Sequence, residues 1–275
     1  MLADIDVNPM RRVALVIQYL GTRFYGWQRQ VKHQSVQQTI EDILNHLCGH
    51  KIVLHGAGRT DTGVHAAAQV AHFETNSPIP PDKWSKVLNA HLPKDILIRE
   101  SVLVPHEWHA RFSATWRRYR YAIFTEAVPN LFVRDFSWHY YFDRLDESLI
   151  QAALAPLLGK QNLAALQRAG SKRAHAWLTV QEAICWRDRG FVYVEMQASG
   201  FLYGMMRLLV GLLVEVGRSR LSVQEFTDIW QQQRREDVRY AAPPQGLCLL
   251  GIGYDRTPFK SSAPEKVPKS FLFPA

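Results

Sequence analysis

The stretch H-G-A-G-R-T-D-T-G-V-H-A-A-A-Q-V-A-H-F, residues 55–73, is the part of the chain around which the rest is organised. It places a single carboxylate, Asp61, between an arginine and a glycine, and three glycines nearby give the backbone the freedom that a tight exposed turn needs. The apolar run from Val64 to Phe73 then returns the chain to a core. The pattern indicates a turn that holds one reactive group at a cleft.

Three other interpretations of this stretch stay open at this point. An Asp in a Gly-rich loop commonly turns the chain by accepting hydrogen bonds from its own backbone. The G-x-G also resembles a phosphate-binding loop, although the lysine and the helix-opening Ser or Thr of a P-loop are missing. A metal site is the third interpretation, because His and Asp are ordinary ligands, but the chain has no H-E-x-x-H pattern or cysteine pair to support it. Its four candidate ligands are His55, Asp61, His65 and His72.

Length and charge narrow the class of protein. At 275 residues with 47% apolar composition, the chain can bury a substantial core as one large domain or two smaller ones. Its formal net charge is +8 and its pI is near 9.5, so we expect an acidic partner. Basic residues recur in short groups beside aromatic residues, which makes nucleic acid the natural candidate.

The cysteines and the N-terminus indicate a cellular compartment. Cys48, Cys185 and Cys248 are scattered singly and form no metal-binding spacing, so we expect reduced cysteines in a cytoplasmic protein. Residues 1–12 contain two aspartates and no apolar signal-peptide run, and no stretch of 18 apolar residues occurs in the sequence. Neither secretion nor membrane spanning is expected.

The first half, residues 1–110, is predicted to be a small α+β unit. Hydrophobic spacing and helix-start signals predict a central strand at 12–19, a helix opened by the Ser35 and Gln38 capping box, short strands at 51–54 and 64–73, a helix opened by Pro80-Pro81, and a strand at 95–104. The order strand, helix, strand, strand, helix, strand fits a ferredoxin-like half with helices on one face of a sheet.

An aromatic loop follows the first predicted strand. Residues 21–30 place three aromatics, among them Trp27, between Arg23 and Arg29. Such a loop can stack bases and bind phosphates, and a hydrophobic clamp under the loop explains the aromatics equally well.

The second half, residues 111–256, opens with a second group of aromatic and basic residues. In a strand at 116–124, Tyr119 and Tyr121 lie on one face and Arg118 and Arg120 on the other. The aromatic face could hold a base, or the arginines could form a solvated face backed by core tyrosines.

Further elements follow in the second half. We expect a helix capped by Asp146, a phosphate-contacting surface loop at 161–177 that carries Lys172 and Arg173, and a hairpin around 187–190. A helix begins at the capping box of Ser222, and a strand at 246–254 closes the half. The element order thus repeats that of the first half, and residues 257–275 form a tail.

Arg207 is the second unusual charge, because it sits inside an apolar helix predicted at 201–216 and closed by Gly217. A guanidinium stays charged, so a buried one needs a carboxylate or several hydrogen-bond acceptors. The alternative is that Arg207 extends to water along its aliphatic stem.

Taken together in order, these residues resemble the tRNA pseudouridine synthase A family along nearly the whole chain. The shared motifs are Tyr19-x-Gly21, Gly26-Trp-Gln28, Gly58-Arg-Thr-Asp-x-Gly-Val-His65, Gln69-Val70, His72-Phe73, Asn89-x-x-Leu-Pro93-x-Asp95-Ile96, His109-Ala-Arg-Phe-Ser-Ala114, Arg118-Tyr-Arg-Tyr121, Phe201-x-x-x-Met205-x-Arg207, Val210-Gly211 and Gly246-Leu247. Any one of these pieces is a weak signal, whereas the ordered set is highly specific.

The resemblance implies two ferredoxin-like halves joined into one mixed, mainly antiparallel sheet, with helices on one face and an active-site cleft between the halves. It also implies a cytoplasmic homodimer without metal or organic cofactor, which isomerises uridine to pseudouridine in the anticodon stem-loop of tRNA at positions 38, 39 and 40.

The resemblance further assigns roles to single residues. Asp61 matches the catalytic aspartate, and Arg207 the arginine that pairs with it. Tyr119 matches the tyrosine that packs on the target base, Arg59 the arginine that takes the place of the flipped nucleotide, and Leu247 a leucine lining the pocket. Arg111 and Trp27, which lie in two of the shared motifs, are further candidates for substrate binding. Two rival functions are a non-catalytic tRNA-binding chaperone, favoured by charge and aromatics alone, and a metal-dependent RNA hydrolase using the histidines.

Overall fold

The computed structural model describes residues 9–170 and 175–260. The chain forms two compact units, which are described separately. Among the described residues, the first unit comprises 9–114 and 251–260, and the second comprises 115–170 and 175–250. Lys172, Arg173 and residues 261–275 of the expected tail lie outside the described residues.

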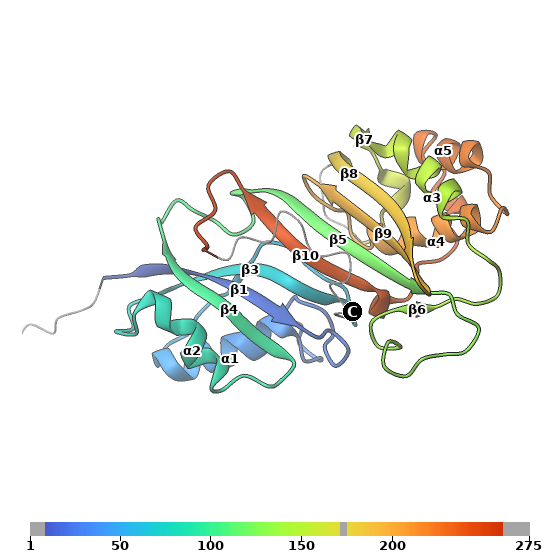
Figure 1. Ribbon diagram of the computed structural model, residues 1–275. Coiled ribbons are helices and arrows are strands. Elements are labelled where there is room, and N and C mark those ends of the chain that lie inside the picture. Colours follow the sequence, from blue (N-terminus) through green and yellow to red (C-terminus); the bar gives the residue numbers. More distant parts are fainter. Residues whose placement is uncertain (1–8, 171–174, 261–275) are drawn as a thin grey trace, which may run out of the picture. The chain divides into compact units, whose positions relative to one another are not determined.

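The first unit has the expected order of elements (Figure 1). They are β1 (Arg11–Tyr19), α1 (Val36–Cys48), β2 (His55–Gly56), β3 (His65–Thr75), α2 (Trp84–Asn89) and β4 (Ile96–Val104). The strands are hydrogen-bonded in the order β4-β1-β3-β2, and all three pairs are antiparallel. This is the strand order of a ferredoxin-like unit, in which the first strand lies between the third and the fourth.

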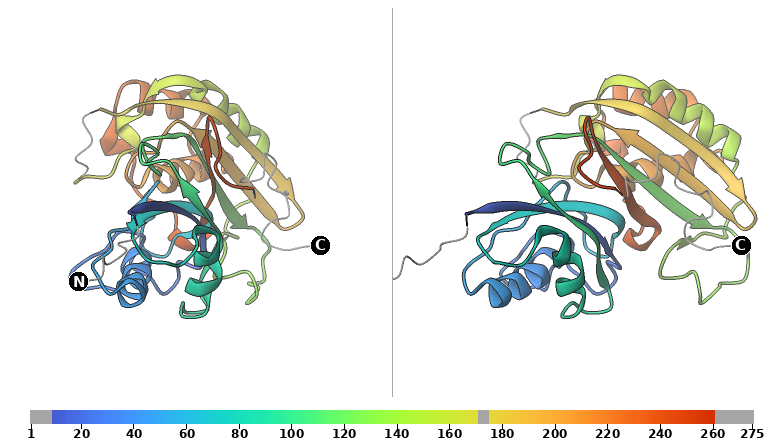
Figure 2. Two further views of the ribbon diagram at one scale, coloured as in Figure 1. Left: turned by 90° about the vertical axis from the view of Figure 1, so that its left-hand side faces the viewer. Right: turned by 60° about the vertical axis from the view of Figure 1, so that its left-hand side comes forward.

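Local signals explain the ends of α1. The Ser35 side chain accepts a hydrogen bond from the backbone N–H of Gln38, as the capping pattern predicts. Gly49 ends the helix in the left-handed conformation, with φ of 71°. Both α1 and α2 lie on one face of the strands of this unit (Figure 2).

The second unit repeats this plan with insertions. Its elements are β5 (Ala114–Phe124), β6 (Trp138–His139), α3 (Glu147–Leu154), β7 (Gly159–Asn162), β8 (Trp177–Asp188), β9 (Phe191–Ala198), α4 (Met205–Gly217), α5 (Val223–Gln231) and β10 (Leu247–Tyr254). Its strands follow the order β10-β5-β9-β8-β7, so the same ferredoxin-like order recurs. Of β10, Leu247–Leu250 belongs to the second unit and Gly251–Tyr254, beside β3, to the first.

The α+β class and the mixed, mainly antiparallel sheet are confirmed, since β5 and β6 form a parallel pair among the ten described strands. Helix α3 packs on β8, and α4 and α5 pack against α3. Short 3-10 helices complete the described elements: η1 (Pro81–Lys83), η2 (Ala155–Leu157), η3 (Ala164–Leu166), η4 (Arg235–Asp237) and η5 (Pro244–Gly246). None of the helices within the described ranges has both the length and the apolar character needed to cross a membrane.

Three expected boundaries differ from the structure. Residues 51–54 form no strand, because the pairing with β3 begins only at His55. The apolar helix begins at Met205 rather than 201, since Gly204 before it has φ of 69° and is not helical, and Gly217 is its last residue rather than its cap. The expected surface loop at 161–177 includes the end of β7, which pairs with β8.

Candidate active site

Asp61 lies in the connection between β2 and β3, in the first unit. Gly63, two residues later, has φ of 79°, a left-handed conformation that glycine adopts without strain. The backbone N–H of Val64 donates to the carbonyl of Asp61 at 3.1 Å. The predicted turn is therefore present, and it leaves Asp61 half-buried.

The segment after β1 packs directly against this turn. The backbone N–H of Trp27 donates to the carbonyl of Thr60 at 3.1 Å, and the hydroxyl oxygens of Tyr19 and Thr60 are 2.7 Å apart. Gly26 comes so close that an added Cβ would lie 2.5 Å from the Thr60 carbonyl oxygen. The position of Asp61 is thus set by contacts to the residue immediately before it.

Gln69 fixes the other end of the turn. Its side chain is fully buried, and its amide bridges one residue: Nε2 donates to the carbonyl of Gly58 at 2.9 Å, and Oε1 accepts from the Gly58 N–H at 3.3 Å. This role of Gln69 was not predicted from the sequence. The available signal was a lone amide in the run A-A-A-Q-V-A, because a buried polar group needs hydrogen-bond partners.

Arg59 is exposed but oriented by a chain of amides. Its Nε donates to Oε1 of Gln28 at 3.0 Å, and Nε2 of Gln28 donates to Oε1 of Gln37 at 2.8 Å. Gln37 in turn donates to the buried carboxylate of Glu41 at 3.0 Å. The guanidinium of Arg59 is therefore held at the turn by a network that begins in the helix α1.

Trp27, a candidate for substrate binding, lies beside the turn. Its side chain is only 2% exposed, and a Cβ added at Gly56 would lie 2.4 Å from its indole nitrogen. The ring also packs near Tyr19, with centroids 6.0 Å apart. These contacts support the turn, as the interpretation of residues 21–30 as a hydrophobic clamp expects.

The histidines near Asp61 serve as hydrogen-bond acceptors. His65 Nδ1 accepts from the backbone N–H of Gly21 at 3.0 Å, and His72 Nδ1 accepts from that of Ala110 at 3.2 Å. Burial, followed by the charges of His109, His55 and Arg12, lowers the pKa of His72 to about 3. Within the described ranges, no group of three or more His, Cys, Asp or Glu side chains could hold a metal ion.

In the second unit, Tyr119 lies on β5 with its ring against Phe201, the centroids 4.7 Å apart. Its register partner on β9 is Met196. Tyr119 is 7% exposed, so its ring is largely enclosed by neighbouring side chains.

The arginines on the opposite face of β5 are not solvated. Arg120 is 3% exposed and donates through Nε to Glu195 at 2.7 Å, while Arg118 forms ion pairs with Glu195 and Glu182. The Arg120 guanidinium also lies 5.1 Å from the ring centroid of Trp186. The interpretation as a solvated arginine face was wrong, because carboxylates on β8 and β9 neutralise it.

Arg207 is the third residue of α4 and is half-buried. Its Nε donates to the carbonyl of Ala242 at 2.7 Å, and its own carbonyl accepts from the Ala242 N–H at 2.8 Å. Leu247, also buried, is the first residue of β10. In the first unit, Arg111 is exposed, and its guanidinium lies 5.8 Å from the ring centroid of Phe112.

The candidates therefore form two groups. Asp61 and Arg59 come together on one turn of the first unit. Arg111 lies in the same unit, near the end of its segment 9–114. Tyr119, Arg207 and Leu247 lie in the second unit, on β5, α4 and β10. A lone aspartate on a glycine-lined turn of a basic α+β protein is an arrangement that suits carboxylate chemistry on a nucleic acid.

Comparison with known proteins identifies the family. The family model described as tRNA pseudouridine synthase matches residues 15–113 and 153–255. The chain is 61% identical over 259 residues to the tRNA pseudouridine synthase A of a Nostoc species, covering 94% of this chain and 92% of that protein. It is 60% identical to the protein of that name from Rippkaea orientalis, covering 94% and 88%, and 58% identical to that from a Synechocystis species, covering 92% of each.

The chain belongs to the tRNA pseudouridine synthase family, whose members are isomerases. Among solved structures, a Cbf5–Nop10–Gar1 complex aligns with a TM-score of 0.33 at 13% identity, over 74% of this chain and 45% of that one. That likeness is too low to carry an argument.

Proposed function

We propose that the protein isomerises uridine to pseudouridine in the anticodon stem-loop of tRNA, at positions 38, 39 and 40. Asp61 acts as nucleophile or base on a uridine flipped out of its stack. The observation that carries this proposal is the rigid turn, in which Gln69, Thr60 and Gly26 fix the backbone on both sides of one carboxylate. A residue that only turned the chain would not need support from two distant segments.

The reaction explains why one well-placed carboxylate suffices. The N1–C1′ bond must break, the uracil must rotate, a C1′–C5 bond must form, and the proton must leave C5 while N1 gains one. A carboxylate can serve as the nucleophile that holds the sugar or base, or as the base that accepts the proton. Neither role calls for a metal or an organic cofactor.

The other candidates take roles that match their surroundings. Arg59, held by Gln28, would fill the gap left by the flipped uridine, which offsets part of the cost of unstacking. Tyr119 and Leu247, both largely enclosed, would confine the detached uracil. Arg207 would favour the ionised form of Asp61, and Arg111 would contact phosphate.

We further propose that the protein works in the cytoplasm as a homodimer with tRNA as its partner. The cysteines support a reducing compartment, because Cys48, Cys185 and Cys248 are all free. Burial raises the pKa of the Cys185 thiol to about 12, so this thiol has little tendency to react.

The decisive experiment removes the carboxylate and keeps its shape. Asp61→Asn is expected to lower tritium release from tRNA labelled at uridine C5 by a factor of about 10³ or more, since a positioned acid–base group contributes roughly 10²–10⁴ and a nucleophile more. Affinity for tRNA should stay within about twofold, because the amide keeps the size of the side chain and the phosphate contacts are untouched.

Asp82→Asn is the matched control. Asp82 is an exposed aspartate of the same unit that forms an ion pair with its neighbour Lys83, so its loss should change neither rate nor affinity. Full activity of Asp61→Asn would overturn the assignment. Activity that persists in EDTA excludes the metal-dependent hydrolase, and turnover by the wild-type protein excludes a purely chaperone role.

A further inference from the structure

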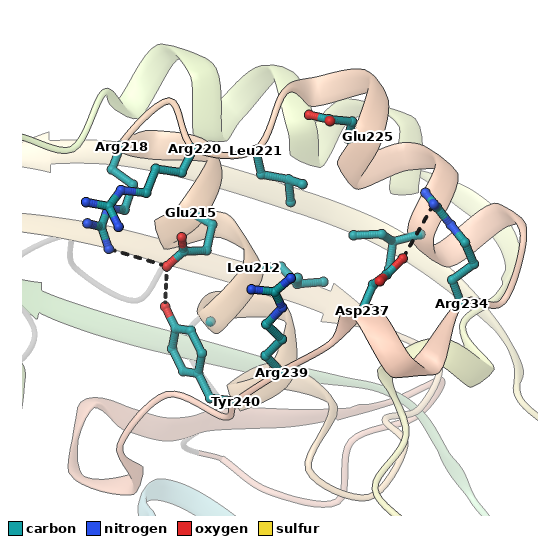
Figure 3. Close-up of a pocket in the computed structure, with 12 residues that line it drawn as sticks. Leu212, Glu215, Arg218, Arg220, Leu221, Glu225, Arg234, Asp237, Arg239 and Tyr240 are labelled. Carbon is teal, nitrogen blue, oxygen red and sulfur yellow. Dashed lines mark hydrogen bonds and ion pairs between the residues drawn. The ribbon is translucent and has the colours of Figure 1, made fainter.

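A pocket in the second unit lies apart from the residues assigned above. Its cavity of about 430 Å³ is formed by the C-terminal half of α4, by α5 and by the segment that leads to Tyr240 (Figure 3). Four arginines and three carboxylates line it, together with the apolar side chains of Leu212, Leu221 and Ile229. Apolar walls beside charged groups strengthen electrostatic interactions with a ligand.

Protein groups already engage the three carboxylates. Glu215 accepts from the Tyr240 hydroxyl at 2.9 Å and lies 3.6 Å from Arg218. Asp237 lies 3.4 Å from Arg234, as the dashed line in Figure 3 marks. The third, Glu225, accepts from the backbone N–H and the hydroxyl of the helix cap at 2.8 and 2.7 Å.

Two arginines remain available to a ligand. Arg220 and Arg239 are both exposed, and the guanidinium of neither forms an ion pair or hydrogen bond with any residue in the described part of the chain. Figure 3 shows the Arg220 guanidinium beside that of Arg218, while Arg239 extends into the space between Glu215 and Asp237. A guanidinium binds an anionic oxygen pair through two parallel hydrogen bonds, so two free arginines at one cavity suit a phosphate group.

Two segments of the chain that line the pocket also lead to Arg207. On α4, Glu215 is eight residues beyond Arg207, which corresponds to about 12 Å along the helix axis. Arg239 is three residues before Ala242, whose carbonyl binds Arg207, so it lies within about 10 Å of that contact. Gly211 also allows the Tyr240 backbone to pack on α4, since a Cβ there would lie 2.6 Å from the Tyr240 carbonyl oxygen.

We propose that this pocket binds a phosphodiester group of the tRNA substrate, with Arg220 and Arg239 as its ligands. The inference rests on the proposed function, because it is the role of Arg207 near the target uridine that brings RNA within reach of the cavity. The site positions the substrate without touching the reacting atoms, so it affects tRNA affinity before it affects the chemical step.

The test is the salt dependence of tRNA binding. The double variant Arg220→Gln, Arg239→Gln should bind unmodified tRNA about tenfold more weakly near 0.1 M salt, because it loses phosphate contacts. The slope of log affinity against log salt should become shallower by about 1 to 2. The rate of tritium release at saturating tRNA should stay within about twofold, and Arg220→Lys, Arg239→Lys should restore most of the slope.

The hairpin residue Arg189 supplies the matched control. It is exposed, belongs to the same unit and forms no ion pair with a described residue, so Arg189→Gln removes one charge without touching the pocket. An equal loss of slope in Arg189→Gln and in a single pocket variant would mean that only net charge matters, and would overturn the proposal. An unchanged slope in the double variant would do the same.

Two further outcomes separate the possible failures. In the first outcome, inorganic phosphate raises the melting temperature of the wild type but not of the double variant, while the two proteins bind tRNA equally well. This result would assign the pocket to a free phosphate and overturn the tRNA assignment. If Asp61→Asn stays active while the pocket variant shows a shallower salt dependence of tRNA binding, the proposed chemistry is wrong and the proposed binding site is supported. If Asp61→Asn is inactive and the slope is unchanged, only the pocket fails.

Discussion

The two units share one strand order but use their buried polar side chains differently. In the first unit, neutral groups such as Gln69 and Thr60 hold the backbone of a single turn. In the second, the charged side chains of Arg120 and Glu195 cross the face of the sheet and neutralise one another. Neutral contacts can position a carboxylate without competing with it for charge, whereas a buried ion pair contributes to the sheet and is unavailable to a ligand. These neutral contacts of the first unit therefore hold the turn that carries Asp61, whereas the Arg120–Glu195 pair of the second unit is committed to the sheet.

The largest expected effect is the loss of stability caused by Glu195→Ala, which tests the contrast between the two units. Glu195 is the partner of Arg120, both are almost fully buried, and removing one member of a buried pair leaves an uncompensated charge. We expect the free energy of unfolding to fall by about 3–5 kcal/mol, measured by urea denaturation. Affinity for tRNA in the fraction that remains folded should change little.

Glu182→Ala is the control for that variant. Glu182 pairs with Arg118, but its side chain is 42% exposed, so the loss should be below about 1 kcal/mol. Equal destabilisation by the two variants would show that burial of the pair is irrelevant. A strong loss of tRNA binding in Glu195→Ala would show that these charges contribute to RNA binding.

These arginines also show where sequence patterns stop being informative. Period-two alternation placed Arg118 and Arg120 on one face of a strand and the tyrosines on the other, and the structure agrees. Whether that face was solvated depended on Glu195, which lies 75 residues beyond Arg120. Local spacing contains no information about such a partner, so the strand was predictable and its neutralisation was not.

The candidate site, too, was only partly predictable from the sequence. Glycines, a lone aspartate and the motif resemblance were enough to predict the turn and to name Asp61 and Arg59. The supporting contacts were not predictable, because Tyr19 and Thr60 are 41 residues apart and meet only when β1 pairs with β3. For the same reason the sequence did not predict that the Trp27 ring packs against the Gly56 backbone.

The second prediction tests whether close backbone approach positions Asp61. Gly26→Ala places a Cβ 2.5 Å from the Thr60 carbonyl oxygen and imposes a left-handed φ of 81° on alanine. We expect a loss of stability of about 3 kcal/mol, of which the conformation itself accounts for about 1–2. Because a displacement of about 1 Å at a reacting group can cost a factor of about 10², tritium release should fall by about 10- to 100-fold.

Gly49→Ala separates the cost of the left-handed conformation from the cost of the steric contact. Gly49 also has a left-handed φ, of 71°, but an added Cβ there meets nothing within 4 Å. It should lose only the conformational part of the stability and keep full activity. Equal loss of activity in the two glycine variants would contradict a positioning role for the contact between Gly26 and Thr60.

The smallest effect concerns His72, a buried histidine of the first unit whose Nδ1 accepts a hydrogen bond from the Ala110 N–H. Its pKa is lowered from 6.5 to about 3, chiefly by burial, with His109, His55 and Arg12 acting in the same direction and Glu74 opposing them. Below pH 6.5 the unfolded chain takes up a proton at this histidine that the folded protein does not. The stabilisation is therefore complete above pH 6.5 and is lost progressively as the pH falls from 6.5 towards 3.

The slope of this loss is about 1.4 kcal/mol per pH unit, so His72 alone should cost about 2 kcal/mol between pH 6.5 and pH 5. His72→Asn isolates the contribution, since the amide oxygen can accept the hydrogen bond from the Ala110 N–H as Nδ1 does, and an amide does not titrate. Urea unfolding of both proteins at several pH values measures the difference. If the wild type and the variant lose stability in parallel below pH 6.5, His72 is protonated in the folded state, and the assignment of a neutral ring is wrong.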